Sequence, residues 1–314
     1  MTDYNELLRN GVVKRRLLRK STNVFMLGLT GALTLLALVP LFWIIGYVVY
    51  RGGSNINIAL FTQMPRPMGV AGGGVLHAIE GSIIVTILAT TFAVVPGVLA
   101  AFYASRNPNT PLGVALRFST DVLSGVPSII VGLFGYALIV KPEKHYSALA
   151  GGVALAVIML PTIIRTTEEM LKLVPSNLRE GSLALGAPEW KTSVSVLLPA
   201  ALNGVITGVL LSVARAAGET APLLFTTLGN DRFDVGAIVS SGITNHQSIF
   251  AIIGRIFNSP IDSLPLTLWK YAQQPYPERV NQAWAVAFVL LVLVLATNII
   301  ARVWIELRKR KLRG

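Results

Sequence analysis

Six long apolar stretches that are almost free of charge constrain the fold of this chain more than any other feature. They are residues 24–50, 82–105, 118–140, 145–164, 192–214 and 280–301, and Asp121 is the one charged residue among them. A helix needs about 20 apolar residues to cross the hydrocarbon core of a bilayer. The sequence therefore predicts an all-α, polytopic membrane protein with six transmembrane helices.

The composition agrees with a membrane protein and argues against other classes. Charged residues are 13% of the 314 residues, whereas soluble domains carry about 25%. The lack of cysteine excludes thiol catalysis, thiolate metal sites and disulfides. His77, His145 and His246 are dispersed without metal-ligand spacing. We interpret these three histidines as isolated loop residues and expect no metal site.

Residues 235–254 form a seventh uncharged stretch, but it differs from the other six. Its middle is rich in Ser, Thr, Asn and Gln, which suit a bilayer core poorly. We predict that this stretch is non-spanning or re-entrant.

The first apolar stretch is predicted to remain as a permanent helix. At 27 residues it is too long for a signal peptide, and no convincing small-residue cleavage site follows it. Residues 1–23, which precede this stretch, are basic, with leucines among the charged residues. They form either a helix lying on an anionic membrane surface or a basic tail that only orients the first span.

The net charge of +12 is interpreted as an orientation signal. Six spans place both termini on one side, and residues 308–314 form a second basic tail. If that side is the cytoplasm, eighteen of the 27 Lys and Arg lie inside, eight lie outside, and Arg215 lies in the membrane. Such a bias is typical of cytoplasmic loops. We expect both termini in the cytoplasm and no binding of nucleic acid.

The long connection between the fourth and fifth stretches, residues 165–191, is predicted to contain two short helices. Pro175 with Ser176 is a helix-start signal, and Gly186 suits the end of that helix. Pro188 followed by Glu189 suits the start of a second one. Because both ends of the connection are tied to the bilayer, it is better suited to docking a cytoplasmic protein than to binding DNA.

This connection resembles the EAA loop of ABC-importer permeases, whose pattern is Glu-Ala-Ala, three residues, Gly, nine residues, Ile, any residue, Leu-Pro. The matching residues are Glu180, Gly181, Ser182, Gly186, Val196, Leu198 and Pro199, with small or branched replacements at 181, 182 and 196. In that family the loop forms a coupling helix that sits in a groove of the ATPase subunit. The resemblance implies a type I ABC-importer permease fold over residues 24–307, with its coupling loop at 165–199.

The predicted fifth span carries small residues at every fourth position. They are Ala200, Gly204, Gly208, Ser212, Ala216 and Thr220. Small residues let the backbone of a neighbouring membrane helix approach closely. This stripe therefore predicts tight packing against another helix.

Two charged residues stand near the end of the same span. Arg215 lies 16 residues beyond Pro199, which is roughly 24 Å along a helix, and a charge inside a bilayer is costly unless it is paired or hydrated. Glu219 follows four residues later, and we expect it one turn further on the same helical face. The two form either an ion pair that fixes packing or a polar station for an oxyanion, which a guanidinium binds well, and both roles can coexist.

Three passages resemble the phosphate-specific permeases of this family: residues 214–225, 124–135 and 263–269. The resemblance implies that the chain is one of two homologous permease subunits of an ATP-driven phosphate importer. It implies as partners a second permease, a dimer of ATPase subunits that bind ATP and Mg²⁺, and an extracytoplasmic phosphate-binding protein. It implies a substrate pathway at Arg215, Glu219 and Thr220, and location in the inner membrane of a prokaryote.

The sequence leaves two alternatives: an importer for another oxyanion, or a channel-like or scaffold membrane protein without a coupled ATPase. The chain has no Gly-x-x-x-x-Gly-Lys-Ser/Thr loop. We therefore expect no enzyme activity and no cofactor in this chain, and ATP hydrolysis in a partner.

Overall fold

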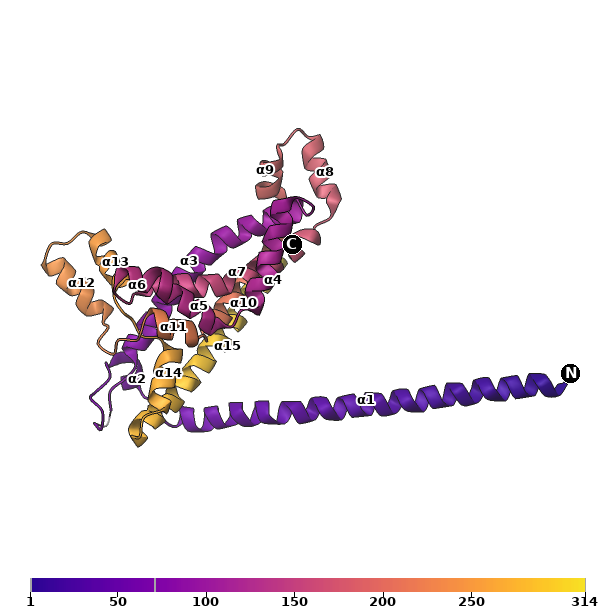
Figure 1. Cartoon of the computed structure of the whole chain (residues 1–314), viewed down its shortest axis with the longest axis horizontal. Helices are drawn as coiled ribbons and strands as arrows, with labels where there is room; N and C mark the ends of the chain where they lie inside the picture. The colour runs from indigo at the N-terminus through magenta and orange to yellow at the C-terminus, as the bar shows by residue number, and fades with distance from the viewer. Residues whose placement is uncertain (1, 71, 314) are drawn as a thin grey trace. The chain divides into compact units, whose positions relative to one another are not determined.

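The computed structural model describes residues 2–70 and 72–313, and it describes side chains for residues 19–70, 72–300, 302 and 303. The described chain is helical, and its one β-type pairing is an isolated bridge between Pro65 and Gly73 (Figure 1). It divides into two units, Met1–Arg51 and Gly52–Gly314, which are described separately.

The first unit is formed by helix α1, Thr2–Gly53, whose last two residues belong to the second unit and which is continuous through Pro40. Its part Arg19–Gly53 is long and apolar enough to cross a membrane, with a mean hydropathy of 2.3. Residues 2–23 of the predicted basic segment continue into this span without a break in the helix. The interfacial interpretation depends on side chains 1–18, which lie outside the described residues.

The second unit contains four further helices that could each cross a membrane. They are α3 (Leu76–Arg106), α7 (Ala148–Lys172), the run Glu189–Ala216 and the segment Pro277–Ile300 of α15 (Pro277–Arg313). The run Glu189–Ala216 comprises α9 (Glu189–Thr192), a π-helical turn (Ser193–Leu197) and α10 (Leu198–Ala216).

The third predicted span is broken. It consists of α4 (Pro111–Gly125) and a second piece, Ser128–Glu143, bent by 105° from the first. The second piece comprises α5 (Ser128–Gly135), a π-helical turn and α6 (Lys141–Glu143). Pro127 causes the break because it lacks an N–H and holds Val126 in an extended conformation (φ −73°, ψ 127°). The prediction of six spans is confirmed when this bent pair counts as one.

The core of the second unit is centred on α7. Its Leu155, Met159 and Ile163 are almost fully buried against Val85 and Leu88 of α3. Glycines on both helices allow this approach. A Cβ on Gly97 of α3 would lie 2.9 Å from Ile163, and one on Gly152 of α7 would lie 2.6 Å from Leu88.

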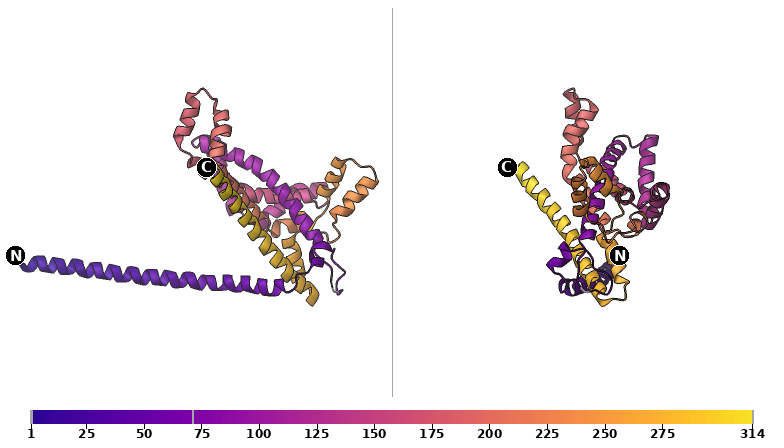
Figure 2. Two further views of the ribbon diagram at one scale, coloured as in Figure 1. Left: turned by 180° about the vertical axis from the view of Figure 1, so that it is seen from behind. Right: turned by 90° about the vertical axis from the view of Figure 1, so that its left-hand side faces the viewer.

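Short helices lie between these longer ones along the chain. They are α2 (Ile58–Thr62), α8 (Ser176–Ala184), α11 (Ala221–Thr226), α12 (Val235–Thr244), α13 (Ile249–Asn258) and α14 (Leu264–Ala272). At ten residues each, α12 and α13 are about 15 Å long, too short to span, as predicted for residues 235–254. The α8–α9 hairpin and the α12–α13 hairpin project at well-separated places (Figures 1 and 2).

Candidate coupling loop and substrate pathway

The two short helices predicted in the connection 165–191 are present, and both begin where the sequence predicts. Helix α8 begins directly after Pro175, and α9 begins directly after Pro188. Gly186 adopts φ +82°, a conformation open mainly to glycine. Its N–H donates to the carbonyl of Leu183, and the N–H of Ala187 donates to that of Ser182. These two hydrogen bonds form the glycine-closed helix end that the sequence predicts.

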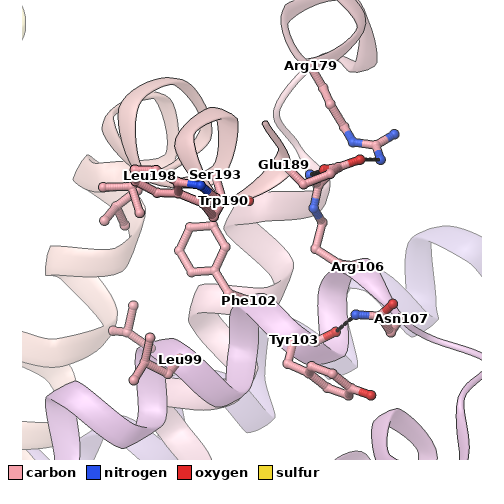
Figure 3. Close-up of a pocket in the computed structure, with 12 residues that line it drawn as sticks. Leu99, Phe102, Tyr103, Arg106, Asn107, Arg179, Glu189, Trp190, Ser193 and Leu198 are labelled. Atoms are coloured by element: carbon pink, nitrogen blue, oxygen red, sulfur yellow. Dashed lines mark hydrogen bonds and ion pairs between the residues drawn. The ribbon is translucent and has the colours of Figure 1, made fainter. Parts of the chain in front are cut away.

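Glu189 ties this hairpin to the end of α3. Its carboxylate accepts from Arg179 of α8, with the Arg179 Nη2 to Glu189 Oε1 distance at 2.5 Å, and also from Arg106, the last residue of α3 (Figure 3). The hydroxyls of Ser182 and Thr192, 2.9 Å apart, join α8 to α9 a second time. Side-chain contacts therefore join α8 and α9 to each other and to the end of α3.

The predicted coupling residues divide into two groups. Glu180, Gly181 and Gly186 are exposed, Ser182 is half-buried, and Leu185 beside them is 90% exposed. Leu198 and Pro199 instead open α10. The hairpin thus leaves a surface with an apolar component uncovered by the described part of this chain.

Helix α10 packs against α7 through the predicted stripe of small residues. A Cβ on Gly204 would overlap Met170, and one on Gly208 would overlap Thr166, both on α7. Ser212 and Ala216 continue the stripe and are buried. The prediction of tight packing is confirmed, although Ala200 is exposed and Thr220 lies beyond the end of the helix.

The expectation that Glu219 lies on the same helix as Arg215 is wrong. Helix α10 ends at Ala216. The N–H groups of Gly218 and Glu219 then make turn hydrogen bonds to the carbonyls of Arg215 and Ala216. The physical reason is local, because Gly218 weakens the helix and Pro222 in the first turn of α11 cannot continue it.

Arg215 and Glu219 are nevertheless close in space. The Nε of Arg215 lies 3.6 Å from Oε1 of Glu219. The side chain of Arg215 is 55% exposed and that of Glu219 is 18% exposed. Thr220, half-buried, caps α11 without a side-chain hydrogen bond. The guanidinium is therefore only loosely paired and keeps donors that could bind an anion.

The broken third span positions the segment that follows Arg215. A Cβ on Gly132 of α5 would lie 2.7 Å from the Cα of Pro222, so α5 and α11 meet backbone to backbone. Sequence reasoning missed this contact, since a single glycine in an apolar stretch does not reveal its partner. The placement of Glu219 and Thr220 thus depends on α5 as well as on α10.

Basic side chains predicted on one side of the membrane gather at the hairpin end of the molecule. Glu168 of α7 pairs with Arg117 and with Lys172, the latter at 2.7 Å, and Asp121 pairs with Arg165 at 3.1 Å. Lys172 also lines a small cavity together with Arg106 and Arg179. These contacts agree with the prediction that the loops carrying these basic residues lie on the same side of the membrane.

A buried ionic cluster lies near the first turn of α3, away from this end. His77 is fully buried in α3, so its interpretation as a loop residue is wrong. Its Nε2 lies 3.4 Å from Asp262 and 3.7 Å from Asp231, a three-residue grouping compatible with metal ligation. The ammonium of Lys270, however, contacts both carboxylates and supplies the positive charge between them.

Two groups of this cluster, Asp262 and Lys270, have pKa values that their neighbours shift. Burial alone would raise the pKa of Asp262, but His77 and Lys270 outweigh it and hold that pKa below its ordinary value. Burial alone would lower the pKa of Lys270, but Asp262 and Asp231 outweigh it and raise that pKa. Lys270 and Asp262 therefore stabilise each other as ions.

Comparisons with known proteins give consistent similarities. Residues 93–313 match the family described as "Binding-protein-dependent transport system inner membrane component". Proteins named phosphate transport system permease protein PstA are similar: that of Yersinia pestis is 40% identical over 92% of this chain and 92% of its own. That of Haemophilus influenzae is 38% identical over 93% and 96%.

Among solved structures, inward-facing MetNI methionine ABC transporter has a similar chain. The TM-score is 0.54 and the identity is 18%, over 74% of this chain and 94% of that one. At this identity the likeness shows the fold alone, and it agrees with the predicted ABC-importer permease fold.

Proposed function

Because the chain belongs to the family of binding-protein-dependent transport system inner membrane components, we propose that it is the PstA-like permease subunit of an ATP-driven phosphate importer. The relatives named PstA support phosphate as substrate, since they match this chain over nearly its whole length. The residues 221–224 and 263–265 favour the same subunit over its PstC-like partner.

The observation that carries the substrate proposal is the loosely paired Arg215. Its side chain is 55% exposed at the end of a helix long enough to span. A planar fork of N–H donors matches the oxygens of phosphate. Glu219, 3.6 Å away, keeps the net charge of the station low, so that phosphate is attracted without being held tightly. Thr220 adds a hydroxyl beside them.

The proposed energy source is a separate pair of PstB-like ATPase subunits that bind ATP and Mg²⁺. The exposed α8–α9 hairpin suits docking to such a subunit, with Glu180, Gly181, Ser182 and Gly186 at the contact. The hairpin continues through the π-helical turn Ser193–Leu197 into α10, which begins with Leu198 and Pro199 and carries Arg215. Movement of the hairpin would thus reach Arg215 along α10. It would also reach α3 by way of the contact between Glu189 and Arg106.

The proposed assembly lies in the plasma (inner) membrane of a prokaryote, with both termini in the cytoplasm. Its partners are a PstC-like permease and a PstS-like phosphate-binding protein on the outer side. The cluster of basic side chains at the hairpin end supports this orientation. The proposed domain organisation is a basic segment at 1–23, a permease domain at 24–307 and a basic tail at 308–314.

The proposed mechanism is alternating access. Closure of the ATPase dimer on ATP moves the α8–α9 hairpin and opens the permease pair outward. The binding protein then releases phosphate into the cavity, where Arg215 receives it. Return to the inward-facing state releases phosphate to the cytoplasm.

Uptake of radiolabelled phosphate by the reconstituted complex tests this proposal. We expect uptake that requires ATP and that excess sulfate does not inhibit. Inhibition by sulfate would instead favour an importer for another oxyanion. Uptake without ATP, or failure of an ATPase to co-purify with the chain, would favour an uncoupled channel or scaffold protein.

A further inference from the structure

A groove of about 650 Å³ lies between the end of α3 and the start of the α9–α10 run, outside the proposed phosphate station (Figure 3). Its deep walls are apolar, formed by Leu99 and Phe102 of α3 together with Val194 and Leu198. Leu99 is 65% exposed and Val194 is 58% exposed. The described part of the second unit leaves this apolar surface uncovered.

The mouth of the groove is charged and lies where two spans end. Arg106 is the last residue of the apolar helix α3, and Glu189 is the first residue of the run Glu189–Ala216. Val98, the lining residue of α3 farthest from the end of that helix, lies eight residues before Arg106, which is about 12 Å along a helix. The groove therefore runs from a charged rim, at the end of one apolar helix and the start of another, along the apolar surface of α3.

The rim carries a surplus of positive charge. Arg106 and Arg179 share the single carboxylate of Glu189. The Nε of Arg179 is buried and has no hydrogen-bond partner among the described residues. A second anion beside the two guanidiniums would balance the charge and accept from the N–H groups that remain accessible, since the Arg179 side chain is 41% exposed.

The aromatic side chain at the rim also suits the membrane surface. Trp190 lines the groove and is 70% exposed. Tryptophan is enriched where one part of its ring contacts hydrocarbon and the other contacts headgroups. The apolar groove, the cationic rim and the tryptophan together suit a molecule with an apolar chain and an anionic headgroup.

We propose that this groove binds an anionic phospholipid, with an acyl chain along Leu99 and Phe102 and its phosphate at Arg106 and Arg179. The apolar walls select a lipid over a free anion, and the unbalanced guanidiniums select an anionic headgroup over a zwitterionic one. Since Glu189 already joins α8 and α9 to α3, the lipid phosphate would bind at the joint between the hairpin and the spans. The site is independent of which substrate the complex carries.

Quenching of Trp190 fluorescence by brominated lipids tests this proposal in the complete complex. The chain has five tryptophans, so the signal of Trp190 is the difference between the unaltered complex and a complex with Trp190→Phe. We expect brominated phosphatidylglycerol to quench this difference signal at about fivefold lower mole fraction than brominated phosphatidylcholine. One uncompensated basic charge near the surface gives roughly that preference.

The variant pair Arg106→Gln with Arg179→Gln should abolish the preference for phosphatidylglycerol. Arg165→Gln is the matched control, because Arg165 is also predicted to face the cytoplasm but pairs with Asp121 outside the groove. It should keep the preference. Equal quenching by the two lipids in the unaltered complex, or a preference that survives the double variant, would overturn the proposal.

Two further outcomes identify a different occupant and also overturn the proposal. If Trp190 is quenched only after the ATPase has been stripped from the complex, a protein surface fills the groove. If inorganic phosphate removes the preference at constant ionic strength, the rim binds the free anion. A fluorescence readout keeps all these results separate from phosphate uptake, so the proposed function is tested independently.

Discussion

Arg215 and Glu219 face each other across the end of α10, with 3.6 Å between Nε and Oε1. Arg215 belongs to the helix, whereas Glu219 belongs to the turn before α11. The pair therefore bridges two successive elements of the chain. An anion could separate the two side chains without unwinding the helix.

We predict that Arg215→Ala abolishes phosphate uptake while the complex still assembles. A charge-assisted hydrogen bond contributes about 2 kcal/mol, which is about 30-fold in affinity per bond lost. Because Arg215 is 55% exposed, its removal leaves no cavity in the core. Uptake by proteoliposomes and subunit stoichiometry by size-exclusion chromatography measure the two effects.

Arg215→Lys serves as the matched variant, since it keeps the charge but loses the planar fork. We expect it to retain part of the uptake. Normal uptake by Arg215→Ala would exclude Arg215 from the pathway and leave the ion pair as a packing feature.

We predict that Gly186→Ala weakens coupling to the ATPase. Gly186 has φ +82°, and a residue with a Cβ pays roughly 1–2 kcal/mol in that region. A Cβ there would meet no neighbouring atom, so the effect is conformational rather than steric. Stimulation of ATP hydrolysis by the binding protein, together with co-purification of the ATPase, measures it.

Gly186→Asn is the control for this variant, because asparagine tolerates the left-handed region better than other non-glycine residues. We expect Gly186→Asn to couple better than Gly186→Ala. Equal coupling by the two variants would argue against a conformational role of Gly186.

We predict that Gly204→Ala destabilises the chain and that Met170→Ala relieves much of the effect. A Cβ at 204 would overlap the flexible side chain of Met170, and overpacking costs about 1–3 kcal/mol. In a double-mutant cycle on the melting temperature in detergent, the two changes should couple favourably. Gly208→Ala with Met170→Ala is the comparison, because the side chain overlapped at 208 belongs to Thr166. Additive effects at 204 would contradict the proposed α10–α7 contact.

Local rules explain what the sequence predicted well. The hairpin boundaries at Pro175, Gly186 and Pro188 follow from residues that act on their own backbone. The spans follow from hydrophobicity summed over 20 residues or more. Both signals are contained in short windows of sequence, so no knowledge of tertiary contacts is needed.

Tertiary contacts explain what the sequence did not predict. Pro127 is visible in the sequence, but the 105° bend depends on how α5 packs on α11. His77 is separated from Asp262 by 185 positions, yet their side chains lie 3.4 Å apart. The exposure of Arg215 likewise depends on helix α10 ending at Ala216. The apolar pattern of the sequence continues beyond that residue, so it does not mark the end of the helix.

We predict that Lys270→Met lowers the free energy of unfolding by about 3 kcal/mol, since it leaves buried Asp262 without its ammonium partner.

In the unaltered chain the pKa of Asp262 is lowered and that of Lys270 is raised. The contribution of Asp262 is thus present above its ordinary pKa and is lost only as pH falls through its lowered pKa. The contribution of Lys270 is present below its ordinary pKa and is lost only as pH rises through its raised pKa. The ion pair therefore stabilises the fold equally from pH 5 to pH 8.

The variant should respond to pH with the opposite sign. Without Lys270, the burial of Asp262 is opposed by fewer partners and its pKa rises relative to the unaltered chain, so uptake of a proton by Asp262 relieves the unpaired charge. We expect the melting temperature of Lys270→Met in detergent to rise from pH 7 to pH 5, relative to the unaltered chain. Lys141→Met, at an exposed lysine, is the control and should show no such change. A pH profile of Lys270→Met parallel to that of the unaltered chain would show that Asp262 does not depend on Lys270 for its charge.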